Sequence, residues 1–414
     1  MPDLDIGKLN ALRGGRDANS NGMQCPALRQ LKESTATHQA PSIEQGYFIL
    51  TMMPSLYCEL DCPHCYLSRE QRKNPATLKT GALRKIITGV DAFYKARKIR
   101  GKTIQAYHYG GEPTSMGTDA FIEILDVIDS ILKPESGYDV RHTILTSLAG
   151  VDLDIWHRVF RDRCGGRLQT SYDGRMRGRG YLKLWESQMR RARELGLKLS
   201  TISVLNTGMI KDGPEHAIDY LRELGVVEAS FLPFMLNKQN SGKKYDVLAP
   251  SMSEWSNFMI ELSRVWMARR ANGVSVPEIG QMRFVLAQDE MWSPVSNVAG
   301  QTLFLMPDGS WSLPDYRNGR EEYMLGFGNG LDDDFASILS SPKRREYLRR
   351  QIARNGNAEC LECPHANRCV MEFWKANRSG DECFGGRRYI EWVLENRDRI
   401  LSLDQCIDRD VLIY

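Results

Sequence analysis

The stretch YFILTMMPSLYCELDCPHCY, residues 47–66, joins a strand-like run to three closely spaced cysteines. Residues 47–53 are apolar, aromatic or β-branched, which is typical of a buried strand. Cys58, Cys62 and Cys65 follow within one short segment, with three and then two residues between them. The sequence therefore predicts three thiolate ligands in a loop directly after a strand.

The alternation of short strands and longer amphipathic helices continues as far as residue 235. The predicted strands are 47–53, 103–109, 140–147, 167–173, 198–206 and 227–234. Apolar residues at three- and four-residue steps predict helices over 79–97, 118–133, 182–195 and 214–224. This pattern predicts an α/β fold with a partial (βα)6 barrel of the TIM type, in which ligands bind at the C-terminal ends of the strands.

The composition excludes several classes of protein. The 55 basic and 52 acidic residues give a net charge of +3, which is too balanced for a nucleic-acid or anionic-membrane partner. No apolar run approaches the roughly 18 residues of a membrane span, and the N-terminus lacks a secretion signal. We therefore expect a cytoplasmic protein, and in that reducing compartment the ten cysteines are not expected to form disulfides.

Outside the predicted barrel, the chain divides into four further parts. Residues 1–46 contain no aromatic residue and are expected to form a flexible extension. Residues 236–296 are interpreted as a helical linker with one long helix over 252–272. Residues 297–390 form a second region with a hairpin over 303–311 and a basic helix over 341–355, and residues 391–414 form a tail.

The three cysteines of residues 58–65 fit an iron–sulfur cluster better than a zinc ion. Three thiolates leave one iron of a [4Fe–4S] cluster without a protein ligand, as a reactive cluster requires. Structural zinc usually takes four ligands in pairs, so it fits these three cysteines less well. A zinc site is the alternative interpretation.

The spacing Cys-x3-Cys-x2-Cys after the first strand of such a barrel resembles the radical S-adenosylmethionine (radical SAM) superfamily. Gly110-Gly111-Glu112-Pro113, after the second predicted strand, resembles the motif with which that family holds the ammonium group of SAM. The resemblance implies that Tyr66 and this motif belong to the SAM site. His64 departs from the family pattern, which has an aromatic or aliphatic residue just before the third cysteine.

The ends of the later strands supply further candidates for the SAM site. Relatives contact the SAM carboxylate or ribose from places that correspond to Ser147, Ser171 and Asp173. An arginine of the following loop is expected to pair with the carboxylate, and both Arg175 and Arg177 are candidates. Asn206, at the end of the fifth predicted strand, is a candidate of the same kind.

Four cysteines near the C-terminus form a second group: Cys360, Cys363, Cys369 and Cys383. Four thiolates complete the ligand set of one metal centre. Their spacing resembles the SPASM/twitch auxiliary-cluster domain of peptide-modifying radical SAM enzymes such as anaerobic sulfatase maturases. A zinc knuckle that uses His365 or Cys383 is the alternative. Asn297, Pro314 and Phe373 fill the places of further cluster ligands, which predicts a single auxiliary [4Fe–4S] cluster.

Two residues after the hairpin are candidates for catalysis, because relatives place a proposed base there. Asp315 falls on that place, and Tyr316 lies beside it; a surface loop is the alternative interpretation. Cys25, Cys164 and Cys406 belong to neither group and are interpreted as buried filler, unless one donates a hydrogen atom in an epimerase.

Together, these features predict a radical SAM enzyme that cleaves SAM reductively to a 5′-deoxyadenosyl radical. The resemblance favours oxidation or cross-linking of a peptide or protein side chain, with a flavodoxin or ferredoxin as electron donor. Oxidation or epimerisation of a small molecule is the alternative, and a zinc-stabilised binding protein is the alternative without enzyme activity.

Overall fold

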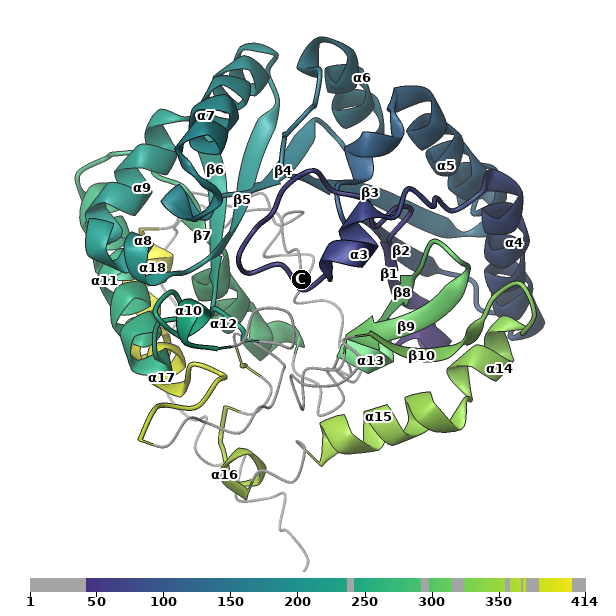
Figure 1. Cartoon of the computed structure of the whole chain (residues 1–414). Coiled ribbons are helices and arrows are strands. Elements are labelled where there is room, and N and C mark those ends of the chain that lie inside the picture. The colour runs from purple at the N-terminus through teal and green to yellow at the C-terminus, as the bar shows by residue number, and fades with distance from the viewer. Residues whose placement is uncertain are drawn as a thin grey trace, which may run out of the picture. The chain divides into compact units, whose positions relative to one another are not determined.

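The computed structural model describes residues 42–236, 242–291, 298–314, 324–353, 358–365, 368–369 and 380–403. These residues contain a ten-stranded sheet in the order β10-β9-β8-β1-β2-β3-β4-β5-β6-β7. Strands β1 to β7 pair in parallel with one another in that order, and β8 pairs in parallel with β1, whereas β9 is antiparallel to both β8 and β10. Figure 1 shows the strands at the centre, within an outer ring of helices.

The strand bounds are β1 Tyr47–Met52, β2 Lys102–His108, β3 Tyr138–Thr146, β4 Arg167–Ser171, β5 Lys198–Val204, β6 Val226–Leu232, β7 Glu278–Ile279, β8 Thr302–Leu305, β9 Ser310–Pro314 and β10 Met324–Asn329. Strands β1 to β6 match the six predicted strands within a few residues at each end. The predicted parallel α/β barrel is therefore confirmed.

The α-helices that follow the barrel strands are α3 Arg69–Lys73, α4 Thr80–Ala96, α5 Thr118–Ile131, α6 Leu153–Arg163, α7 Arg179–Glu194, α8 Thr207–Asp212, α9 Pro214–Glu223, α10 Lys243–Asp246, α11 Met252–Ala271 and α12 Gly280–Met291. Short 3-10 helices are η2 Ile43–Gln45, η3 Pro113–Met116, η4 Pro134–Ser136 and η5 Gly174–Arg177. The remaining helices are α13 Val298–Gln301, α14 Phe335–Leu339, α15 Pro342–Ile352, α16 Ala358–Leu361, α17 Arg387–Glu395 and α18 Arg397–Ser402.

The helices form because their apolar residues recur along one face, which then packs on the sheet. In α4, Leu83, Ile86, Ile87 and Val90 are buried at three- and four-residue steps. In β2, alternate residues are buried, as expected for a strand that turns one face to the helices. The opposite faces of the strands are left to line the interior of the barrel.

The hairpin of β8 and β9 is continuous with the barrel sheet, because β8 pairs with β1. Its turn contains Asp308 and Gly309, and Gly309 has a φ of +84°, which only glycine adopts readily. The Trp311 ring lies 6.0 Å from that of Phe48 and 5.4 Å from that of Phe335. The predicted hairpin is thus confirmed, and its strands belong to the same sheet as the barrel strands.

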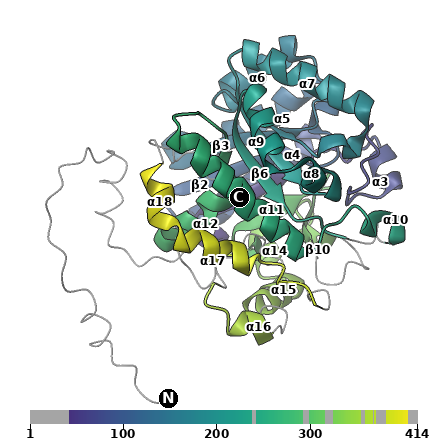
Figure 2. The same ribbon diagram turned by 90° about the vertical axis from the view of Figure 1, so that its left-hand side faces the viewer.

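Helix α17 packs against α11 and α12, as Figure 2 shows. The Tyr389 ring lies edge-on to that of Trp255 at 5.6 Å, and the Tyr389 and Ser263 hydroxyls are 3.2 Å apart. Helix α11, expected in a linker, therefore belongs to the packed helical layer.

Residues 42–46, at the end of the expected flexible extension, are packed. Ile43 is buried, and its carbonyl accepts a hydrogen bond from the Tyr94 hydroxyl at 2.9 Å. Glu44 pairs with the buried Arg344 at 2.8 Å. The rest of the expected extension, residues 1–41, lies outside the described residues.

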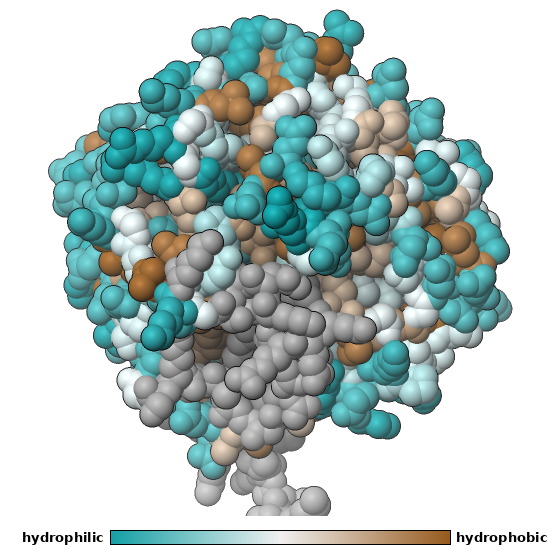
Figure 3. Space-filling view, viewed as in Figure 1, coloured by the Kyte–Doolittle hydropathy of each residue, from teal (hydrophilic) through white to brown (hydrophobic). Residues whose placement is uncertain are grey.

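The outer surface in Figure 3 is mainly hydrophilic, with apolar residues in separate patches. Among the described residues, none of the helices combines the length and apolar character that a membrane crossing requires.

Candidate functional site

A cavity of about 250 Å³ lies at the C-terminal ends of the barrel strands. It is lined by all three cysteines of the loop after β1 and by most of the predicted SAM-site residues: Tyr66, Gly110, Gly111, Ser147, Ser171, Asp173 and Arg177. Tyr109, Val204, Leu232 and Met235 also line it. The fold thus brings residues from six strand ends to one cavity.

The cysteine loop is folded around a buried arginine. The Arg72 guanidinium donates through Nη1 to the Leu60 carbonyl and to Asp61 Oδ1, both at 2.7 Å. The Arg72 carbonyl in turn accepts a hydrogen bond from the Cys58 N–H at 3.0 Å. Helix α3 supplies Arg72 because Ser68 and Gln71 cap its N-terminus reciprocally. Arg72 therefore fixes both the start and the middle of the loop.

Gly110 and Gly111 are required because the cysteine loop lies directly against them. A Cβ on Gly111 would lie 2.2 Å from the Leu56 carbonyl oxygen and 2.3 Å from that of Tyr57. Gly110 has a φ of +131°, and a Cβ there would lie 2.5 Å from the Ser55 carbonyl oxygen. The two glycines thus allow the close approach of the loop that carries the cysteines, besides exposing backbone to the cavity.

Glu112 does not line the cavity, and its carboxylate is surrounded by hydrogen-bond donors of the protein. Oε1 accepts from the Thr114 N–H (3.3 Å), the Thr114 hydroxyl (2.6 Å) and the Thr146 hydroxyl (2.8 Å). Oε2 accepts from the Ser147 N–H (2.8 Å) and hydroxyl (2.5 Å). In this arrangement Glu112 joins the ends of β2 and β3, and Pro113 begins η3 beside it.

Tyr66 and Tyr109 form a stacked pair in the cavity wall, with ring centroids 5.7 Å apart. The Tyr66 hydroxyl donates to the Gly110 carbonyl at 3.2 Å. Tyr66 therefore ties the segment after the third cysteine to the glycine turn after β2.

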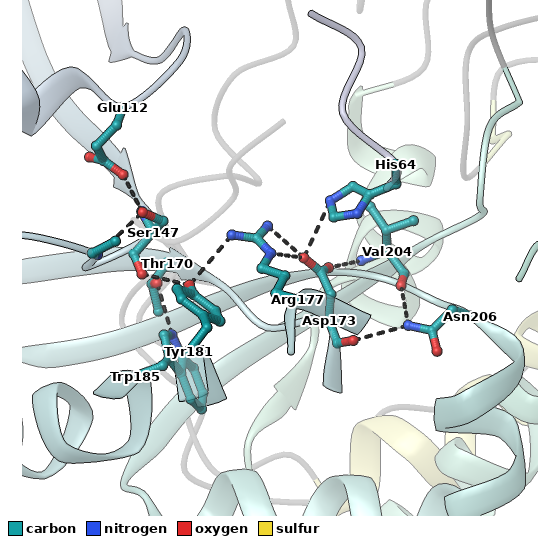
Figure 4. Close-up of polar contacts among 11 residues, drawn as sticks. His64, Glu112, Ser147, Thr170, Asp173, Arg177, Tyr181, Trp185, Val204 and Asn206 are labelled. Atoms are coloured by element: carbon teal, nitrogen blue, oxygen red, sulfur yellow. Dashed lines mark hydrogen bonds and ion pairs between the residues drawn. The ribbon is translucent and has the colours of Figure 1, made fainter. Parts of the chain in front are cut away.

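Asp173, Arg177 and His64 form a buried polar group, shown in Figure 4. Asp173 Oδ2 lies 2.5 Å from Arg177 Nη2 and 3.3 Å from His64 Nε2. Asp173 Oδ1 accepts from the Val204 N–H at 2.8 Å. A carboxylate from the end of β4 thus contacts the η5 turn, the end of β5 and the cysteine loop.

The pKa shifts in this group follow from burial and from the neighbouring charges. Burial lowers the pKa of His64 to about 4, although Asp173 opposes this, so the imidazole is neutral at pH 7. Burial would raise the pKa of Asp173, but Arg177, His64 and the Val204 N–H hold it below its usual value. Burial would likewise lower the pKa of Arg177, and Asp173 raises it instead. Asp173 and Arg177 are therefore a stable ion pair facing the cavity.

A chain of contacts continues from this ion pair to Glu112, as Figure 4 shows. Arg177 Nη1 donates to the Tyr181 hydroxyl at 3.4 Å, and that hydroxyl donates to the Ser147 carbonyl at 2.6 Å. Ser147 is bonded in turn to Glu112. Trp185, one helical turn after Tyr181, donates to the Thr170 hydroxyl at 3.1 Å and fixes α7 on β4.

Two other candidates for the SAM site lie outside the cavity lining. Arg175 is exposed, so of the two arginines it is Arg177 that faces the cavity. Asn206 caps α8, because its Oδ1 accepts from the Met209 N–H at 3.1 Å. The Asn206 side-chain amide donates to the Asp173 backbone carbonyl at 3.1 Å, so it helps to hold the backbone of Asp173 in place.

The donor set of the first loop fits an iron–sulfur cluster. Cys58, Cys62 and Cys65 are free thiols, and burial raises the pKa of Cys58 and Cys62 to about 11. Within the described ranges, no three His, Cys, Asp or Glu side chains converge on a point where they could hold one metal ion. A [4Fe–4S] cluster binds each thiolate to a different iron, so its ligands need not converge in that way.

The second group of cysteines lies around the N-terminal end of α17. Cys383 Sγ accepts a hydrogen bond from the Arg387 N–H at 3.4 Å, and burial, with a smaller effect of the nearby Cys363, raises the pKa of the Cys383 thiol. Cys369 Sγ would lie 2.9 Å from a Cβ on Gly385. The Cys363 N–H donates to the Cys360 carbonyl at 3.4 Å. The four free thiols therefore gather in one region of the chain.

Asp381 attaches this region to α11. Its carboxylate accepts from the Met252 N–H (2.8 Å), the Ser253 N–H (3.0 Å) and the Ser253 hydroxyl (3.0 Å). Glu382 accepts from the Ser256 hydroxyl at 2.7 Å. These bonds place Cys383 at the N-terminal end of α11.

Several residues named from the sequence lie outside the described residues: Asp315, Tyr316, Asn297, Phe373, Cys25 and Cys406. Pro314 ends β9, where its carbonyl accepts from the Tyr347 hydroxyl at 2.8 Å. Cys164 is buried in the core beside α6, as expected for a filler residue.

Sequence reasoning missed the roles of Arg72, Tyr109 and Tyr181. Arg72 lies on the short helix α3 and Tyr181 just before the predicted helix of residues 182–195; neither belongs to a motif, and the Leu60, Asp61 and Ser147 groups that they bind are distant in sequence. Tyr109 precedes the glycine turn directly, so its position at a strand end was a usable signal.

The sheet order and the cavity at the strand ends define a class of fold: a partial parallel (βα) barrel whose cavity lies at the C-terminal ends of its strands. One structure with this fold is the anaerobic sulfatase maturase anSMEcpe with bound AdoMet and the Cp18Cys peptide. It is 16% identical, the match covers 86% of this chain and 98% of that chain, and the TM-score is 0.66.

A second similar structure is Streptococcus suis SuiB bound to the precursor peptide SuiA, with 15% identity, coverage of 88% and 82%, and a TM-score of 0.52. No family model matches the sequence, and no curated protein matches it either. The likeness is therefore one of fold, and it confirms the fold that the resemblance implied.

Proposed function

We propose that this protein is a radical SAM enzyme. One observation carries the proposal: three cysteines of one loop line the same cavity as the glycine turn after β2 and the Asp173–Arg177 pair after β4. Cys58, Cys62 and Cys65 would hold a [4Fe–4S] cluster with one iron open to SAM. When bound, this cluster supplies the electron that cleaves SAM to methionine and a 5′-deoxyadenosyl radical, which abstracts hydrogen from a substrate C–H bond.

The residues of the chain would divide the binding of SAM between them. The Gly110–Gly111 backbone and Ser147 offer polar groups at the cavity wall, and Arg177 offers a permanent positive charge for a carboxylate. Because Glu112 is bonded to Thr114, Thr146 and Ser147, its part is to hold the strand ends in place. The apolar side chains of Leu232 and Met235 help to exclude water.

The proposed substrate is a peptide or a protein side chain, which would be oxidised or cross-linked. Two similar structures support this class, since one contains the Cp18Cys peptide and another the precursor peptide SuiA. Asp315, with Tyr316 beside it, is the proposed base for the substrate. Cys360, Cys363, Cys369 and Cys383 would hold a single auxiliary [4Fe–4S] cluster, and a flavodoxin or ferredoxin would deliver electrons.

Mass spectrometry of candidate peptides after anaerobic turnover with SAM tests the substrate class. Loss of two hydrogens from a peptide supports oxidation or cross-linking. A product with one solvent deuterium, and no mass change in light water, would instead show epimerisation. Modification of a small molecule alone would replace the peptide proposal with the alternative substrate class.

A further inference from the structure

The contact between His64 and Asp173 links the cysteine loop to the barrel. His64 lies between Cys62 and Cys65, and its Nε2 lies 3.3 Å from Asp173 Oδ2 at the end of β4 (Figure 4). Both side chains are largely buried, with exposed fractions of 13% for His64 and 1% for Asp173. The contact therefore lies in a region where water weakens a polar interaction with a carboxylate only a little.

The position of the His64 ring is fixed from two sides. Asp173 contacts it from β4, and the Phe234 ring lies 6.3 Å away after β6, at an interplanar angle of 69°. Asp173 is itself held by Arg177 and by the Val204 N–H. The carboxylate that His64 contacts is therefore attached to the barrel by two further contacts.

The other attachments of the loop do not replace this one. Arg72 holds the loop through Leu60, Asp61 and Cys58, on the side of α3. Tyr66 holds the following segment at the Gly110 carbonyl. The stretch between Cys62 and Cys65 is attached to the far side of the cavity through His64.

We propose that His64 and Asp173 form a latch that holds the Cys62–Cys65 segment across the cavity and orders the three thiols before metal is bound. His64 is thus a positioning residue that acts through the protein. The ordering of the metal-free loop by this contact does not depend on the proposed function. An effect of the contact on retention of the cluster rests on the proposed function.

A pair of amide variants tests the latch with matched chemistry. The amide nitrogen of glutamine reaches as far as His Nε2, whereas that of asparagine reaches only as far as Nδ1. His64→Gln should keep the contact with Asp173, and His64→Asn should lose it. In the metal-free full-length chain, amide hydrogen exchange of residues 58–66 should become about tenfold faster in His64→Asn and stay near wild type in His64→Gln.

Asp173→Asn completes a double-mutant cycle. Adding His64→Asn to Asp173→Asn should not accelerate exchange further, because the partner is already lost. Equal exchange in wild type and His64→Asn, failure of His64→Gln to restore protection, or additive effects in the cycle would each overturn the latch.

A second readout follows the loaded protein. After anaerobic reconstitution, His64→Asn should lose iron from the first loop to a chelator about tenfold faster than His64→Gln, and the EPR signal of the reduced cluster should change in His64→Asn alone. A wild-type chain that binds zinc and shows no cluster signal would contradict the proposed function. The hydrogen-exchange comparison would still decide the latch in that case.

Discussion

Glu112 and Ser147 lie at the ends of adjacent strands, and Glu112 Oε2 accepts hydrogen bonds from both the backbone N–H (2.8 Å) and the hydroxyl (2.5 Å) of Ser147. The pair connects the end of β2, where the glycine motif lies, to the end of β3. Since Ser147 lines the cavity, this connection determines the shape of the wall where SAM is proposed to bind.

Glu112→Gln should lower both stability and the affinity for SAM. The glutamine NH2 group cannot accept the donors that surround one of the carboxylate oxygens, so buried donors lose their partner. We expect the free energy of unfolding to fall by about 1–3 kcal/mol. Denaturant unfolding measures this, with the exposed Glu135→Gln as the matched control. An unchanged midpoint for Glu112→Gln would contradict the structural role.

Gly111→Ala should displace the cysteine loop, because its Cβ would overlap the Leu56 and Tyr57 carbonyls. We expect a loss of about 3 kcal/mol in unfolding free energy, at the upper end of the cost of overpacking. Gly89→Ala is the matched control, since nothing lies within 4 Å of a Cβ there in α4. That change should stabilise the chain by about 0.5–1 kcal/mol. Similar effects of the two changes would show that the loop does not lie against Gly111.

The buried His108–His142 pair should make stability depend on pH. The two rings are joined at 3.0 Å, and His142 contacts Asp129, which pairs with Arg163. Burial and then His142 lower the pKa of His108 well below 6.5, although Asp129 opposes this. On acidification the unfolded chain therefore binds a proton at His108 near pH 6.5, whereas the folded chain does not. The free energy of unfolding contains this contribution above that pH and loses it as the pH falls.

His108→Gln should remove this component. The unfolding free energy of the wild type should fall more steeply below about pH 6, by up to about 1.4 kcal/mol per pH unit, than that of the variant. Urea unfolding at several pH values gives both slopes, with the partly exposed His157→Gln as the control for losing a histidine. Parallel slopes for wild type and His108→Gln would refute the expectation.

Asp381→Ala should loosen the second group of cysteines. Asp381 satisfies the first N–H groups of α11 and fixes the segment that contains Cys383. Loss of such a cap costs about 1 kcal/mol, which a thermal melt detects. We also expect a lower iron content at the second centre, with normal iron at the first. Asp332→Ala, at an exposed aspartate, is the control; equal iron in the two variants would argue against the anchoring role.

The sequence predicted the barrel well because its strands and helices have clear periodicity. Strands β1 to β6 start and end within a few residues of the predicted ranges, and the Asp308–Gly309 turn was visible as a dipeptide. The position of β8 beside β1 was not predictable, because a parallel pairing across some 250 residues of chain leaves no local signal.

The candidate site was predicted where residue type and spacing carry the chemistry. The three cysteines of the first loop and the Gly110–Gly111 turn could be recognised in this way, and the structure brings them to one cavity. The bonds of Glu112 to Thr146 and Ser147 depend on the alignment of β2 and β3, and the contact of His64 with Asp173 depends on how the loop folds back. Such relationships arise from tertiary packing, so the sequence alone could not reveal them.

The most direct test of the central claim is metal analysis combined with SAM cleavage. The chain, purified anaerobically and reconstituted with iron and sulfide, should be brown, contain about eight irons and form 5′-deoxyadenosine from SAM and dithionite. The triple variant Cys58→Ala, Cys62→Ala, Cys65→Ala should keep about four irons and should form no 5′-deoxyadenosine. A colourless protein with stoichiometric zinc and no 5′-deoxyadenosine would contradict the account.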